Sequence, residues 1–308
     1  MLPAPLLFVL LSIALIFLPG YLIYSIWTAR EPSKYDWIIR VLNSAGFIVI
    51  LFLIGRWDWF SYYLRFVILV LFNAAAVASF RHVIKKPFFV GEGRQRWMKK
   101  PSALVELVLV IGALIYLISG SFYSGDAVNL EFPLQDGQYY IAHGGSNLAL
   151  NNHSPNESQH YALDIAELNA LGRRSTGIYP SDLDSYVIFD EVIHSPCDGT
   201  VSAAVDGLPD LTPPESDSEN PAGNHVVVDC LGVKVVLAHM REESVLVSEG
   251  DTVTSGQPLG RVGNSGNTTE PHLHMHAVEG DAADVLEGEA VPIEFDGSFP
   301  VRNSMITR

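Results

Sequence analysis

The sequence has few basic residues, and most of them lie in its first part. The whole chain holds 19 Lys and Arg against 34 Asp and Glu, and residues 122–308 hold only 7 against 29. A surface that binds nucleic acid needs clustered basic side chains, so we expect no nucleic-acid partner. The acidic part contains a single lysine, Lys234, inside an apolar run. Since a lipoyl or biotinyl carrier needs a modifiable lysine at a hairpin tip, the sequence also argues against a carrier.

Cysteine is scarce as well. Cys197 and Cys230 both lie in the acidic part, and neither has the C-x-x-C spacing of a metal knuckle. An oxidising compartment would permit a disulfide between them. Two buried free thiols are the alternative, and the sequence leaves both open.

Charged residues are nearly absent from four long apolar runs ahead of residue 122. Each run is close to the ~20 residues that a helix needs to cross a bilayer. The sequence therefore predicts an N-terminal transmembrane region of four helices over residues 1–121. The runs cover Leu6–Trp27, Trp37–Gly55, Phe60–Phe80 and Ala103–Phe122.

The basic residues between these runs predict their orientation. Lys and Arg gather around the first connection, at Arg30–Arg40, and in the third, at Arg81–Lys100. Both connections should be cytoplasmic by the positive-inside rule, which makes Arg56–Trp59 a short outer turn. We expect a multi-pass protein of the plasma membrane, with the lipid bilayer as a partner and residues 122–308 outside the cytoplasm. The first run lacks the basic start of a signal peptide, so we expect a true span.

The pattern changes after residue 121. Residues 122–137 are predicted to be a linker. From about Gln138, short β-like runs alternate with turn signals, and helical periodicity is scarce. We therefore expect residues 138–308 to form a mainly-β domain built on an antiparallel sheet. The segment Asp206–Gly223 is rich in proline and acidic residues and is predicted to be a surface insertion or loop.

Histidines near the end of this domain are its most informative feature. In an extended strand, alternate side chains point to the same face, so His272 and His274 should converge. Two converging imidazoles are a common start of a zinc site. His239 lies in another apolar run, and Asp164 supplies a carboxylate. Together they are the residue types of a hydrolytic metal centre.

Four stretches, in order, resemble the lysostaphin-type (LytM-like) zinc metalloendopeptidases. The resemblance covers about Tyr139–Val278 and implies a LytM-like β-sheet core. The stretches are Tyr161–Ile165, Ser195–Val201, Leu237–Met240, and the run from Gly250 through Gly263–Asn267 to His274.

The resemblance implies a role for each candidate residue. Asp164 and His274 would be ligands of one Zn²⁺ ion, while His239 and His272 would polarise water and stabilise the intermediate. The remaining ligand is either His153 or His160. The usual His-x-x-x-Asp spacing of the family selects His160, and the pattern of a divergent subgroup selects His153. His276 lies one step further along the same strand face and is expected at the rim of the site.

The resemblance also implies an activity. We expect a membrane-tethered zinc metallopeptidase that hydrolyses peptide bonds, with cross-link or stem peptides of peptidoglycan as substrate. The alternative is a catalytically degenerate LytM-like domain that binds cell wall or regulates a partner hydrolase. The sequence does not indicate the scissile bond, the role of the helices beyond anchoring, or the oligomeric state.

Overall fold

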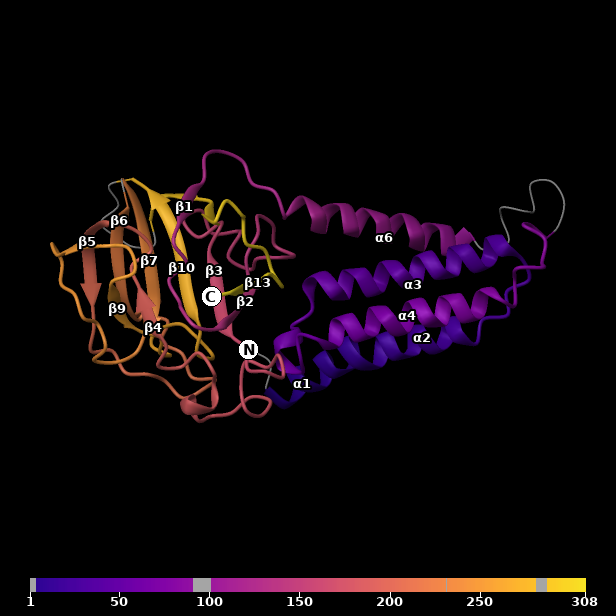
Figure 1. Cartoon of the computed structure of the whole chain (residues 1–308), viewed down its shortest axis with the longest axis horizontal. Helices are drawn as coiled ribbons and strands as arrows, with labels where there is room; N and C mark the ends of the chain where they lie inside the picture. The colour runs from indigo at the N-terminus through magenta and orange to yellow at the C-terminus, as the bar shows by residue number, and fades with distance from the viewer. Residues whose placement is uncertain (1–3, 91–100, 231, 281–286) are drawn as a thin grey trace. The chain divides into compact units, whose positions relative to one another are not determined.

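The computed structural model describes residues 4–90, 101–230, 232–280 and 287–308. These residues form two compact units, and Figure 1 shows the helices of the first and the strands of the second. Unit 1 consists of Met1–Trp57 and Ser61–Ile118. Unit 2 consists of Ser119–Arg308 together with Asp58–Phe60. The latter three residues lie between two helices of unit 1 in the sequence but fold with unit 2.

Unit 1 is helical. Three of its helical stretches are long and apolar enough to cross a membrane: Phe8–Trp27, Lys34–Ile54 and Pro101–Ser119. A fourth, Leu64–Phe80, is apolar but has only 17 residues. The sequence predicted four spans, and the structure supports three by length. Among the described residues, its elements are α1 (Ala4–Ser12), a π-helical turn (Ile13–Phe17), α2 (Leu18–Trp27), α3 (Lys34–Ile54), α4 (Leu64–Phe80) and α6 (Pro101–Ser119). A 3₁₀ turn (Trp57–Trp59) lies between α3 and α4 and includes two residues of unit 2.

Unit 2 is built on one nine-stranded sheet. Its strand order is β13-β2-β3-β10-β7-β6-β5-β8, with β11 also paired to β10. All of its pairings are antiparallel. The strands are β2 (Gln138–His143), β3 (Leu163–Glu167), β5 (Gly199–Val205), β6 (Asn224–Cys230), β7 (Val233–Met240), β8 (Thr252–Val253), β10 (Leu273–Glu279), β11 (Glu289–Val291) and β13 (Met305–Thr307).

Two small sheets complete the unit. β4 (Val192–His194) pairs antiparallel with β9 (Pro258–Arg261), and β1 (Val128–Leu130) pairs parallel with β12 (Ile293–Phe295). A short 3₁₀ turn covers Leu183–Ser185. The described part of unit 2 is therefore mainly β with an antiparallel sheet, as the sequence predicted.

The segment predicted to be a linker takes part in this fold. Residues 122–137 contain β1, and Leu130, Phe132 and Leu134 are buried in the main hydrophobic core. Their side chains alternate with Glu131 and Pro133, so the apolar residues of an extended chain all reach one side. The segment is thus a structural part of unit 2.

The central strands give the sheet two different faces. Leu273, Met275 and Ala277 of β10 point into the main core, as do Val235 and Leu237 of β7. The intervening residues of β7, Val236 and Ala238, belong to a second, smaller apolar cluster on the opposite face. His274 and His276 alternate with the core residues of β10 and are therefore on the second face.

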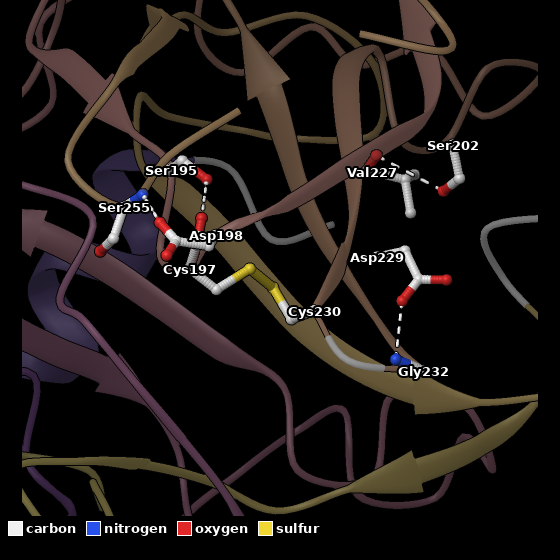
Figure 2. Close-up of a disulfide and its surroundings, with 9 residues drawn as sticks. All are labelled: Ser195, Cys197, Asp198, Ser202, Val227, Asp229, Cys230, Gly232 and Ser255. Carbon is white, nitrogen blue, oxygen red and sulfur yellow. Dashed lines mark hydrogen bonds between the residues drawn. A yellow bond between two sulfur atoms is a disulfide. The ribbon is translucent and has the colours of Figure 1, made fainter. Parts of the chain in front are cut away.

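A disulfide joins Cys197, just before β5, to Cys230, the last residue of β6, and these two strands pair with each other (Figure 2). The two Cα atoms are 5.9 Å apart, and the cysteines are 33 residues apart in sequence. Cys230 belongs to the main core, and Cys197 packs against it. Of the two alternatives for these cysteines, the structure has the disulfide.

Candidate metal centre

The pairing of β3 with β10 brings the first two candidate ligands together. His274 is directly opposite Asp164 in this antiparallel pair, and opposite residues project from the same face. The Nδ1 atom of His274 lies 2.9 Å from Oδ1 of Asp164. Both residues are buried, with 5% and 8% exposure. The register of two neighbouring strands therefore places an imidazole against a carboxylate.

His153 reaches the same carboxylate from a loop. Its Nε2 atom lies 3.0 and 2.9 Å from the two oxygens of Asp164. The fully buried Asn151 shapes this loop, because its amide donates to the carbonyls of Gly145 and Ala162 while its oxygen accepts from the backbone N–H of His153. One ligand atom each from His153, Asp164 and His274 lie within 4.8 Å of one another.

His160 lies outside this group. Its Nδ1–H donates to the carbonyl of Ser154, at 2.6 Å, and its ring packs edge-on against Tyr161. Among the described residues, neither cluster that could hold a metal ion includes it. Of the two histidines that the sequence left open, the structure thus brings His153, and not His160, to Asp164.

A second cluster joins His239 and His272 to His274, again with ligand atoms within 4.8 Å of one another. The two residues are held in the same way. The Nδ1–H of His239 donates to the carbonyl of Ser265, and that of His272 donates to the carbonyl of Glu270, each at 2.9 Å. A carbonyl can only accept, so both rings carry their proton on Nδ1. This leaves Nε2 of each ring for proton chemistry, and Nε2 of His272 lies 3.5 Å from Oδ1 of Asp164.

The backbone at His239 is unusual. Its φ of 62° lies in the left-handed region, which residues with a side chain rarely adopt and which recurs at functional sites. His239 is the second-last residue of β7, and it is buried. The strained conformation turns its ring toward Ser265 and His272.

His276 occupies a different position from the rim that the sequence suggested. It is 2% exposed, and its Nδ1 atom lies 3.1 Å from Nε2 of His274. Nδ1 of His274 faces Asp164, so the other nitrogen of this ring faces His276. A partner of this kind fixes the tautomer and orientation of a ligating histidine.

Charges within the cluster shift its protonation equilibria. Burial alone would raise the pKa of Asp164, but His153 and His272 together hold that pKa well below its ordinary value. Burial lowers the pKa of His274, and it lowers that of His239 strongly. Against the effect of burial, Asp164 raises the pKa of His153 and His272. An ionised carboxylate beside a neutral His274 suits metal binding, and His153 would have to lose its proton to become a ligand.

The predicted insertion supports the loop behind His239. Asp210 accepts a hydrogen bond from the backbone N–H of Asn264, whose side chain donates to the carbonyl of Leu211, each at 2.6 Å. Further along, the backbone N–H of Asp217 donates to the carbonyl of Gly266. Asp206–Gly223 is therefore hydrogen-bonded to the loop that contains Ser265. Sequence reasoning found the histidines but did not indicate the supporting hydrogen bonds of Asn151, Ser265 and Asp210, because a residue pattern does not reveal which backbone groups a side chain contacts.

Part of this chain is similar to a known peptidase family. Residues 187–285 match the model of peptidase family M23, which confirms the resemblance seen in the sequence. The matched region includes His239, His272 and His274, whereas His153 and Asp164 precede it. A search of curated proteins finds no match.

Solved structures with similar folds include two peptidases. A zinc-containing peptidase from Vibrio cholerae is 19% identical with a TM-score of 0.31; the alignment covers 54% of this chain and 41% of that one. Pseudoalterin, a deep-sea M23 metalloprotease, is 14% identical with a TM-score of 0.36, over 59% of this chain and 100% of that one. This chain thus spans less than half the length of the Vibrio protein.

Proposed function

We propose that this protein is a zinc-dependent endopeptidase whose metal is held by His153, Asp164 and His274. The observation that supports this most is the convergence of three donors from a loop and two strands on one point. Two imidazoles and one carboxylate fit zinc, which takes nitrogen and oxygen ligands in catalytic sites with three protein donors. When bound there, zinc would act as a Lewis acid and lower the pKa of a coordinated water.

His239 and His272 supply the proton chemistry in this proposal. Their Nδ1–H groups are held by carbonyls, so Nε2 is the atom of each ring that can take up or give a proton. As water adds to the peptide carbonyl, one imidazole accepts the water's proton at Nε2. The other, which enters the step already protonated at Nε2, donates a hydrogen bond to the developing oxyanion. The accepted proton then moves to the leaving amine as the C–N bond breaks.

We further propose that the substrate is a cross-link or stem peptide of peptidoglycan and that the peptidase is tethered to the plasma membrane. Three apolar helices long enough to cross a bilayer support the tether, and the Lys and Arg distribution supports an outer location for residues 122–308. The turn residues Asp58–Phe60, expected on the outer side, fold in the same unit as Ser119–Arg308. The match to family M23 supports peptide hydrolysis.

The choice between His153 and His160 tests this proposal. The full chain would be purified in detergent, and its zinc content and release of peptides from purified peptidoglycan would be measured. We expect His153→Ala to lose zinc and hydrolysis, because one of three ligands is missing. His160→Ala is the matched control and should keep both. Equal zinc loss in both variants would contradict the assignment of His153, and a zinc-loaded wild type without hydrolysis would favour a degenerate, regulatory domain.

A further inference from the structure

A buried arginine lies close to the catalytic histidines but outside the region matched by the family model. Arg174 is 3% exposed, and its Nε donates to Glu270 at 2.7 Å. The carbonyl of the same Glu270 accepts from His272. Arg174 thus holds the side chain of a residue whose backbone orients His272.

The second partner of Arg174 comes from a distant part of the sequence. A carboxylate oxygen of Asp58 lies 3.6 Å from Nε of Arg174, and the backbone N–H of Arg174 donates to the carbonyl of Asp58. Asp58 is completely buried. A buried charge is costly unless it is paired, so Asp58 and Arg174 depend on each other. Asp58 belongs to what we call the α3–α4 turn, Asp58–Phe60, which folds with unit 2.

A separate set of contacts leads from the same turn to the same segment. The rings of Trp59 and Tyr179 stack with their centres 5.5 Å apart. The guanidinium of Arg174 lies 4.2 Å from the centre of the Trp59 ring. The hydroxyl of Tyr179 donates to the carbonyl of Thr269 at 2.7 Å. Two routes therefore connect the α3–α4 turn to the residues directly before His272, one ionic and one aromatic.

The segment that receives both routes is itself tightly connected. The hydroxyl of Thr268 donates to the carbonyl of Glu270 and lies 3.2 Å from Nδ1 of His272. A small movement of this segment would change the direction of the His272 ring. Displacements of about 1 Å at a catalytic group can lower the rate by ~10²-fold.

We propose that the α3–α4 turn is a positioning element of the peptidase site. Through Arg174 and Tyr179 it fixes the segment Thr268–His272 and so orients Nε2 of His272. A three-residue turn that is far from His272 in sequence thereby acts on a residue of the proposed site within unit 2. The catalytic consequence rests on the proposed peptidase function, whereas the fixing of the segment does not.

Two variants of the full-length, zinc-loaded protein test this proposal. Asp58→Asn removes the carboxylate charge, and Trp59→Leu removes the ring. Asp296→Asn is the control, because it breaks an Asp–Arg pair with Arg308 elsewhere in unit 2. Peptide release from purified peptidoglycan gives kcat and KM, and hydrogen exchange with mass spectrometry reports on the backbone of residues 268–272.

We expect both turn variants to lower kcat by about tenfold, with unchanged KM and zinc content, and to speed exchange in residues 268–272. Wild-type kcat and exchange in both would overturn the proposal. Glu270→Gln is the further variant if either fails to fold, because it weakens the pairing with Arg174 but keeps the carbonyl that holds His272. It should also lower kcat, and combining it with Asp58→Asn should add little, since both act on one network.

The two proposals can fail separately. If the wild type binds zinc without hydrolysing peptidoglycan, the proposed function fails. Hydrogen exchange in residues 268–272 then tests by itself whether the α3–α4 turn fixes this segment. If the wild type hydrolyses peptidoglycan and the turn variants match it in rate and exchange, only the positioning role fails.

Discussion

The two faces of β10 place different demands on neighbouring residues of one strand. On one face, Leu273, Met275 and Ala277 are buried among apolar side chains of the main core. On the other, His274 and His276 are equally buried but contact polar partners, including each other and Asp164. The first face stabilises the sheet by removing apolar surface from water. The second face keeps polar groups away from water, which requires that they be hydrogen-bonded.

This comparison shows why the site can be built at the centre of a sheet. β3 and β7 flank β10 on both sides (Figure 1) and fix its position through backbone hydrogen bonds. The core face supplies most of the stability, so the opposite face can hold histidines and a carboxylate in fixed positions. Stability and chemistry are thus divided between alternate residues, and substitutions should separate them.

Replacing one residue on each face of β10 by alanine should give the largest difference between an effect on zinc content and an effect on stability. His274→Ala should reduce bound zinc from about one ion per chain to nearly none, since it removes one of only three protein ligands. Its matched partner, Met275→Ala, should lower the free energy of unfolding of the β domain by about 2–4 kcal/mol through the cavity it leaves. Metal analysis and denaturant unfolding would measure both. Normal zinc content in His274→Ala, or zinc loss in folded Met275→Ala, would contradict the division between faces.

A finer contrast lies within the polar side of the site. His272→Ala should keep zinc, because His272 directly precedes β10 and its Nδ1 is held by a backbone carbonyl. Its turnover of peptidoglycan peptides should fall by ~10²-fold or more, as expected when a general base or oxyanion donor is lost. Metal analysis and single-turnover rates on the same sample separate the two effects. Unchanged turnover would remove His272 from the mechanism.

The disulfide allows a third test, on the core side of the sheet. Replacing Cys197 and Cys230 together by Ala should lower the free energy of unfolding by about 3–4 kcal/mol, because the bond closes a long loop in the unfolded chain. Zinc content of the folded protein should not change, since Cys230 belongs to the main core. Thermal unfolding with and without reductant would be compared with metal analysis. Loss of zinc below the unfolding transition would show that the two faces are coupled.

The sequence predicted which side chains come together better than where the elements begin and end. The alternation His272-Leu273-His274 predicts a strand with one polar and one apolar face. The ordered stretches around Asp164 and His239 predict the type of site. The choice between His153 and His160 depends on the path of a loop, which Asn151 determines through several hydrogen bonds. Neither the buried position of His276 nor the support from Ser265 follows from local spacing, because both depend on packing between distant segments.

Hydropathy alone led to the expectations that differ from the structure, namely a span over Phe60–Phe80 and a linker over residues 122–137. The apolar run from Phe60 to Phe80 was long enough for a span, but Phe60 folds with unit 2 and the helix begins at Leu64. A hydropathy count cannot tell an aromatic residue that packs in a domain from one in a membrane helix. Similarly, residues 122–137 contain polar and proline residues typical of a linker, while their alternating Leu130, Phe132 and Leu134 fill the core.

Anomalous scattering at the zinc absorption edge, measured on crystals of the zinc-loaded protein, tests the central claim most directly. We predict one strong peak at about 2.0–2.2 Å from Nε2 of His153, an oxygen of Asp164 and Nδ1 of His274. A peak bound by His160, or the absence of any peak between β3 and β10, would contradict it.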